Sequence, residues 1–258
     1  MLIGLLAAAV GLLAACGGSS SSTASPPPSP DTVKGKITVL AAASLTAAFN
    51  QIGGDFQKQH AAASVAFSFA GSPTLVTQIQ QGSPADVFAS ADEANMAKVT
   101  NGLLAVGTPT IFAQNRLQIV VAAGNPKHIT SLADLAQPSI KVVVCAPGVP
   151  CGTYATQAFT KAAVKVTAVS QEDNVKSVVT KVSLGEADAG IVYVTDVKAG
   201  GSTVQGVDIP DTENVVAKYP MVQLKAATNA ASAQAFIAYV TGSQGRQTLT
   251  KFGFLPPS

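Results

Sequence analysis

The chain has 258 residues, of which 47% are hydrophobic and 12% are charged, and its formal net charge is +2. This length accommodates one large or two small domains, and the aliphatic composition can form a sizeable core. The charge is too small and too dispersed for a nucleic-acid-binding surface, so that class of partner is excluded.

The first 15 residues are nearly all small and apolar, and no charged residue precedes Asp31. A membrane span needs about 20 apolar residues, so we predict a signal peptide over 1–15. It ends in LAACG, which resembles a bacterial lipobox and implies lipidation of Cys16 with removal of everything before it. No Lys or Arg precedes the apolar run, so we allow for a start upstream of Met1. An ordinary cleaved signal or a short anchor remains the alternative.

Residues 16–35 form the next segment, which is rich first in Gly and Ser and then in Pro. Such a segment has almost nothing to bury, so we predict a disordered tether. No later run is apolar enough to span a membrane. We therefore expect an exported protein held by lipid alone on the outer face of the cytoplasmic membrane.

From residue 36 onward, β-rich runs alternate with amphipathic helices, which is the pattern of an α/β fold. The predicted strands are 36–40, 65–69, 86–89, 117–122, 142–144, 189–194 and 221–224. The predicted helices are 45–56, 73–81, 92–99, 131–134, 153–164, 175–182, 236–240 and 244–252. Two α/β lobes with a ligand between them fit this order, although a single enzyme domain fits the composition equally well.

Two cysteines remain after Cys16, namely Cys145 and Cys151 in VVVCAPGVPCG. In an exported protein this even remainder suggests a disulfide, and the residues between the two can turn tightly. Two reduced thiols are the alternative. A metal site is disfavoured because no His flanks the pair.

Five short segments place polar residues where strands end or helices begin. They are ITVLAAASL at 37–45, FAGSPTL at 69–75, GSPADVFASAD at 82–92, EDNV at 172–175 and GIVY at 190–193. In this order and spacing they resemble the periplasmic molybdate-binding proteins of ABC importers.

The resemblance implies a type II two-lobed binding-protein fold, in which each lobe is a mixed sheet flanked by helices. Two strands would cross between the lobes, near 115–117 and near 219–222. Lobe 1 would contain 36–115 and 222–258, and lobe 2 would contain 116–221. The implied activity is capture of molybdate or tungstate by a monomer, followed by delivery to an importer permease.

The resemblance also implies five oxyanion-binding residues. Ser44 and Ser72 match serines that donate a hydroxyl and a backbone N–H, and Val175 matches a residue that donates its N–H alone. Tyr193 matches a tyrosine whose hydroxyl closes the site. Cys151 falls where the family often has alanine, again as an N–H donor, and it is bulkier than alanine there.

Elementary chemistry supports such a site. The first N–H groups of a helix have no internal partner and carry partial positive charge, so helix starts bind anions without Lys or Arg. Helix starts are predicted at Ser44, at Ser72, near Gly152 and near Val175, although Pro73 removes one N–H. Taken singly, each serine is more simply an N-cap, Val175 a core residue and Tyr193 a buried tyrosine with a satisfied hydroxyl.

Competing functions fit the sequence less well. Neither His60 nor His128 falls in a catalytic motif, and no nucleophile elbow, P-loop or metal-ligand cluster is present, so we predict no enzyme, no metal site and no cofactor. Arg116 and Arg246 lie off the motifs, which disfavours an organic carboxylate. Sulfate remains the alternative ligand. A protonated phosphate would bring a donor that meets no acceptor.

Overall fold

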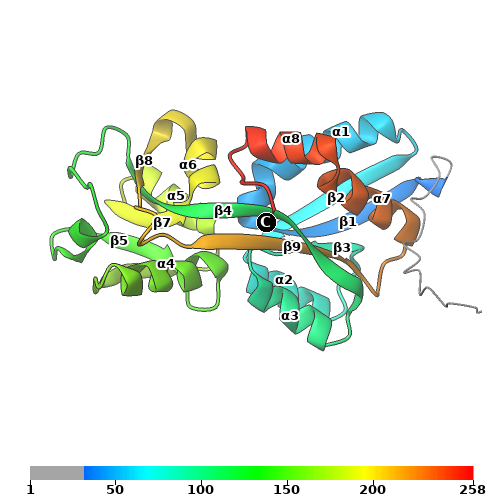
Figure 1. Cartoon of the computed structure of the whole chain (residues 1–258), viewed down its shortest axis with the longest axis horizontal. Coiled ribbons are helices and arrows are strands. Elements are labelled where there is room, and N and C mark those ends of the chain that lie inside the picture. Colours follow the sequence, from blue (N-terminus) through cyan, green and yellow to red (C-terminus); the bar gives the residue numbers. More distant parts are fainter. Residues whose placement is uncertain (1–31, 258) are drawn as a thin grey trace, which may run out of the picture.

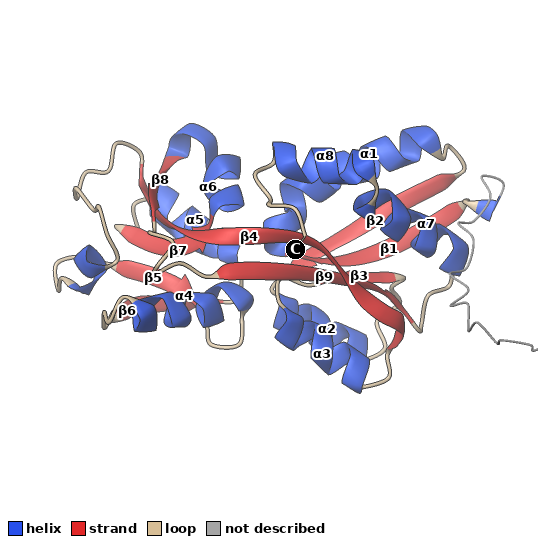
Figure 2. Ribbon diagram, in the orientation of Figure 1, coloured by secondary structure: helices blue, strands red, loops and turns tan. Residues whose placement is uncertain are grey.

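The fold is built on a mixed β-sheet with helices on both faces (Figures 1 and 2). The computed structural model describes residues 32–257. The predicted signal peptide, Cys16 and most of the predicted tether lie outside these residues. None of the helices in the described part is long and apolar enough to cross a membrane.

The elements follow one another along the chain in α/β order. The strands are β1 (Gly35–Ala42), β2 (Ala63–Ala70), β3 (Val87–Ala89), β4 (Ala105–Ala122), β5 (Val142–Cys145), β6 (Ala168–Glu172), β7 (Ala189–Tyr193), β8 (Val204–Asp208) and β9 (Val216–Leu224). The α-helices are α1 (Thr46–Gln59), α2 (Ser72–Gln80), α3 (Glu93–Asn101), α4 (Pro150–Lys161), α5 (Val175–Ser183), α6 (Val194–Gly200), α7 (Ala230–Thr241) and α8 (Ser243–Lys251). Short 3-10 helices include η2 (Ala43–Leu45), η3 (Ala133–Ala136) and η4 (Gly201–Thr203).

Two long antiparallel strands, β4 and β9, connect the two ends of the molecule (Figure 1). The strand order is β2-β1-β3-β9-β4-β7-β5-β6, and β8 pairs with β4 beside this path. We call the end with β1–β3 and helices α1–α3, α7 and α8 the first lobe. The end with β5–β8 and helices α4–α6 is the second lobe. The interface between them lies along the middle of the shared strands.

The predicted crossings, near 115–117 and 219–222, lie within β4 and β9. The exact lobe boundaries stay a prediction, because each falls inside a continuous strand. β4 pairs with β9 from Ala105 to Arg116 and continues into pairing with β7 from Leu117. One strand therefore belongs to the hydrogen-bonding ladders of both lobes.

The predicted strands and helices are confirmed, and the structure adds elements that the sequence reading missed. The helix expected at 131–134 is the 3-10 helix η3, and β6, β8 and α6 were not predicted. β6 has no fully buried residue, and α6 has only seven residues, so neither gives a strong periodic signal. The first part of β4 is mostly exposed and contains Gly107 and Pro109, which read as a loop.

The tether was predicted to run to residue 35, and its last residues are part of the fold. Val33 is buried, and the Ser232 hydroxyl bonds both the N–H and the carbonyl of Lys34. Gly35 opens β1, in register with Ala63. The sequence did not predict that these residues are ordered, because the partner that orders them, Ser232 of α7, lies nearly 200 residues away.

A continuous series of aromatic ring contacts runs from the core of the first lobe to the interface between the lobes. The Phe49 ring lies 5.7 Å from Phe112, which lies 6.3 Å from Tyr219. The Tyr219 ring is 5.9 Å from that of Tyr193, with the planes nearly perpendicular. Such edge-to-face pairs are favourable beyond their buried area. The packing therefore holds both tyrosines rigidly where the lobes meet.

Candidate functional site

A small pocket lies between the lobes, and all five residues predicted for the site line it. Its walls come from the ends of β1, β2 and β7 and from the starts of η2, α2, α4 and α5. The lining residues are Ala42, Ala43, Ser44, Ala70, Gly71, Ser72, Ala91, Val149, Pro150, Cys151, Asn174, Val175 and Tyr193. None of these side chains carries a formal charge. The pocket therefore offers amides and hydroxyls and no charged side chain.

The two serines form the wall contributed by the first lobe. The Ser44 hydroxyl lies 3.0 Å from the hydroxyl of Tyr219, and the Ser72 hydroxyl accepts a 3.2 Å hydrogen bond from the N–H of Ala91. Neither serine makes a side-chain cap bond, since the N-caps of α1 and α2 are Leu45 and Gly71. The N-cap interpretation of these serines was therefore wrong, because each helix begins one residue away from the position read from the sequence.

The starts of α4 and α5 form the wall contributed by the second lobe. Cys151 is the second residue of α4. The carbonyl of Val149 accepts from the N–H groups of Gly152 and Thr153, and not from that of Cys151. Asn174 caps α5 by accepting from the N–H groups of residues 176 and 177, at 2.9 and 3.1 Å. The N–H groups of Cys151 and Val175 belong to first helical turns, which have no partner within the helix and carry partial positive charge.

The Tyr193 hydroxyl is buried in the site without a hydrogen-bond partner. The Tyr193 side chain is 1% exposed, and among the described residues its hydroxyl is the one buried side-chain polar atom without a hydrogen-bond partner. Burial raises the pKa of Tyr193 well above 10, so the group stays a neutral donor. Leaving a buried hydroxyl unpaired costs about 1–3 kcal/mol in desolvation free energy. A bound acceptor that hydrogen-bonds this hydroxyl would offset that cost.

Asp196 is a buried acidic residue three positions after Tyr193. Burial raises the pKa of Asp196 to about 7, while the Tyr193 N–H, which donates to it, and the Lys176 ammonium oppose the shift. Ser44, Lys176 and Asp196 line a hollow beside the pocket. A carboxyl that is partly neutral near pH 7 repels an anion less than an ordinary aspartate does.

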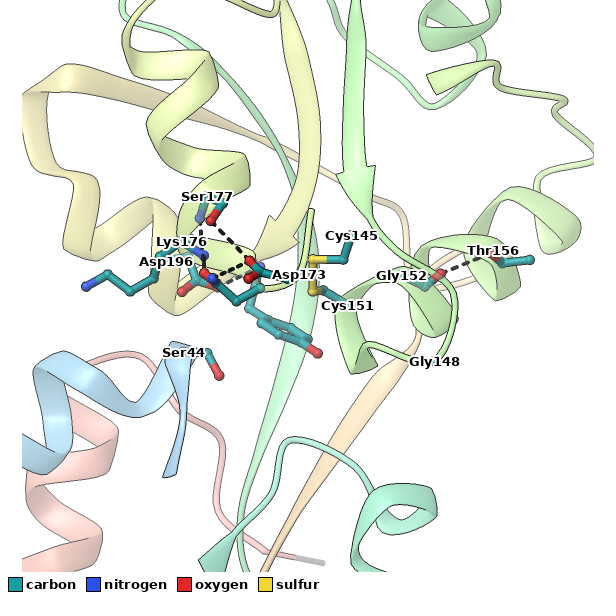
Figure 3. Close-up of a disulfide and its surroundings, with 12 residues drawn as sticks. Ser44, Cys145, Gly148, Cys151, Gly152, Thr156, Asp173, Lys176, Ser177 and Asp196 are labelled. Atoms are coloured by element: carbon teal, nitrogen blue, oxygen red, sulfur yellow. Dashed lines mark hydrogen bonds between the residues drawn. A yellow bond between two sulfur atoms is a disulfide. The ribbon is translucent and has the colours of Figure 1, made fainter. Parts of the chain in front are cut away.

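The structure joins Cys145 and Cys151 by a disulfide, with a Cα–Cα distance of 5.7 Å (Figure 3). The bridge ties the end of β5 to the first turn of α4. Its loop is tight, since a Cβ on Gly152 would overlap the carbonyl oxygens of Cys145 and Ala146. The disulfide therefore stiffens the segment that presents the Cys151 N–H to the pocket.

Neither histidine lies at the pocket. The His60 ring packs 4.6 Å from that of Phe56, and His128 is exposed in a turn. Within residues 32–257, no cluster of three or more His, Cys, Asp or Glu is arranged to hold a metal ion.

Known proteins place this architecture in a family. The family model for bacterial extracellular solute-binding proteins matches residues 37–255. The chain belongs to this family. The molybdate-binding protein ModA of Mycobacterium tuberculosis is 46% identical over 221 residues, which are 86% of this chain and 85% of that protein.

Two solved structures share the fold of this solute-binding protein. The periplasmic molybdate-binding protein of Azotobacter vinelandii is similar with a TM-score of 0.77 at 22% identity, and the match covers 86% of this chain and 100% of that one. The sulfate-binding protein SubI of Mycobacterium tuberculosis has a TM-score of 0.76 at 20% identity, with 86% of each chain covered. At these identities the structures establish the fold alone.

The sequence reading missed polar residues that support the site from the shared strands. Asn115 of β4 donates 2.8 Å to the Thr195 hydroxyl and 3.5 Å to that of Tyr219, which in turn meets Ser44. Asn115, Thr195 and Tyr219 are all buried. β4 also carries Gln114 and Arg116 on either side of Asn115, so its composition did not single out Asn115, and the partners of Asn115 are distant in sequence.

The two lobes of this solute-binding protein touch at the pocket. Gly71 lies against the carbonyl oxygen of Asp173, so closely that a Cβ on Gly71 would overlap it. Gly71 belongs to the first lobe and Asp173 to the second. The two lobes are therefore in direct contact at the edge of the pocket.

Proposed function

We propose that this protein captures molybdate or tungstate outside the cytoplasmic membrane and delivers it to an ABC importer. The unpartnered Tyr193 hydroxyl, in a pocket of uncharged donors at helix starts, carries the proposal. The 46% identity to a molybdate-binding protein supports it. A fully deprotonated tetrahedral dianion accepts every hydrogen bond that this pocket offers.

We propose Ser44, Ser72, Cys151, Val175 and Tyr193 as the residues that hold the anion. The serines would donate their hydroxyls, Cys151 and Val175 their N–H groups, and Tyr193 its phenol. A bound anion would also stand near the positive ends of α2, α4 and α5. Pro73 limits the donors of α2, since it contributes no N–H.

Sulfate is the second candidate, because it has the same shape and charge and because a sulfate-binding protein shares the fold. That structural match is at 20% identity, whereas the molybdate-binding relative is at 46%. Molybdate is therefore the better supported ligand.

Calorimetric titration of the mature protein with molybdate, tungstate, sulfate and phosphate tests this assignment. We expect the first two anions to bind at least about 100-fold more tightly than the others, a difference of about 2.7 kcal/mol. Phosphate should be weakest, because its proton has no acceptor among the donors of the pocket. Tight sulfate binding with weak molybdate binding would replace the proposed ligand by the alternative.

We also propose that the lobes open and close about β4 and β9 to admit and enclose the anion. The contact between Gly71 and Asp173 supports a closed state, and the shared strands are the covalent connections about which the lobes would move. We propose that the protein acts as a monomer, since both lobes that line the pocket belong to the same continuous chain. The expected role is binding rather than catalysis, in keeping with the family.

We further propose that lipid on Cys16 anchors the protein at the membrane surface. The support is the LAACG sequence after an apolar run, followed by a Gly/Ser/Pro-rich segment. The Cys16→Ser variant should pass from the detergent phase to the aqueous phase in detergent partitioning, while the wild type stays with detergent. If the wild-type protein partitions into the aqueous phase, the proposed lipid anchor is wrong, while the proposed ligand is not affected.

A further inference from the structure

A second contact between the lobes lies beyond the walls of the pocket. Asn95, in the first turn of α3, is 1% exposed. Its side-chain Nδ2 donates a 3.2 Å hydrogen bond to the carbonyl of Gly148, in the loop between β5 and α4. The bond joins the first lobe to the second without passing through the shared strands β4 and β9.

The first lobe holds the Asn95 amide in one orientation. Nδ2 lies 3.0 Å from both carboxylate oxygens of Asp92, and the Lys98 ammonium donates to Oδ1 at 3.0 Å. The Asp92 carboxylate also caps α3 through the N–H of Asn95, at 2.9 Å. Because the oxygen and one N–H are occupied within the lobe, the second N–H is directed at Gly148. A donor fixed in advance loses little conformational entropy when it meets its acceptor.

The acceptor is held as firmly on the other side. Gly148 has φ +84°, a left-handed conformation that favours glycine, and it lies within the loop that the Cys145–Cys151 disulfide closes (Figure 3). The next three residues, Val149, Pro150 and Cys151, all line the pocket. A bond to the Gly148 carbonyl therefore positions the start of α4 over the proposed anion.

We propose that Asn95 is a latch that holds the closed state and slows release of the anion. The bond can form only when the lobes meet, so it stabilises the closed form and contributes nothing to an open one. Asn95 does not line the pocket, which makes it a positioning residue. This inference rests on the proposed capture of an oxyanion between moving lobes.

Stopped-flow kinetics with molybdate test the latch, with tyrosine fluorescence as the signal, because the chain has four Tyr and no Trp. In Asn95→Ala the dissociation rate should rise about three- to tenfold, the effect of losing one ordinary hydrogen bond. The association rate should stay within about twofold of wild type, since capture precedes latching.

Two further variants separate the latch from a loss of folding. Asn95→Ser keeps a donor for Asp92 but is too short to reach Gly148, so it should show the same faster release with a melting temperature closer to wild type than that of Asn95→Ala. Asn101→Ala, exposed at the end of the same helix, should release at the wild-type rate.

Wild-type release rates in both folded Asn95 variants would overturn the latch while leaving molybdate binding in place. A change confined to the association rate would overturn it as well. A wild-type protein that binds no molybdate would instead overturn the proposed function, and the latch with it.

Discussion

Tyr193→Phe should bind molybdate about 10- to 100-fold more weakly while its ligand-free form becomes no less stable. The hydroxyl is buried and unpartnered, so removing it relieves a desolvation penalty in the empty protein. In the complex the same change removes a hydrogen bond to a charged group, which contributes about 1.5–3 kcal/mol. Calorimetry gives the first quantity, and thermal unfolding without anion gives the second, where we expect Tm to hold or to rise by about 2–4 °C.

Tyr219→Phe is the matched control, because the Tyr219 hydroxyl is already bonded to Ser44. Its loss should lower the stability of the ligand-free protein by about 1 kcal/mol. The two substitutions remove the same atom from neighbouring rings, yet their effects on stability should have opposite signs. If Tyr193→Phe lowers stability and binds normally, its hydroxyl belongs to the core and not to the anion site.

Gly71→Ala should weaken molybdate binding by roughly 10- to 100-fold, the equivalent of a 1–3 kcal/mol overpacking penalty. The added methyl would overlap the carbonyl oxygen of Asp173 only when the lobes are closed. Gly71 has φ −60° and ψ 141°, which alanine adopts without strain, so an open form should tolerate the change. We therefore expect unaltered thermal stability without anion and a reduced stabilisation when molybdate is added.

Gly54→Ala provides the control for this substitution. Gly54 lies within α1 with open space around its Cα, so alanine should raise stability by up to about 1 kcal/mol and leave binding unchanged. Normal molybdate affinity in Gly71→Ala would show that the protein binds its ligand without bringing these two walls together.

The alternation of strands and helices could be predicted from the sequence because it depends on the period of nearby apolar residues. The start of α5 illustrates this, since Asn174 caps the helix and its apolar face follows at helical spacing. Elements with weak periodicity were missed for the same reason. β6 is exposed at alternate residues without a fully buried position, and α6 has only seven residues.

The sequence predicted which five residues would come together, but not which side chains they would contact. All five predicted residues line one pocket, because the ends of strands and the starts of helices gather at the lobe interface in this fold. The N-cap interpretation of each serine was wrong, whereas anion binding by both stays a prediction. An N-cap rule considers four neighbouring residues, whereas the Ser44 hydroxyl meets Tyr219, which is 175 residues away.

By itself, the sequence determined the α/β class and the approximate positions of the helices with strong periodicity, because these follow from backbone preferences and from residues a few positions apart. Only the tertiary structure decided that the Tyr193 hydroxyl has no partner, that Gly71 touches Asp173 and that Asn95 reaches Gly148. Each of these depends on where the two lobes come to rest against one another. That position is set by packing summed over the whole interface, which no local pattern of residues records.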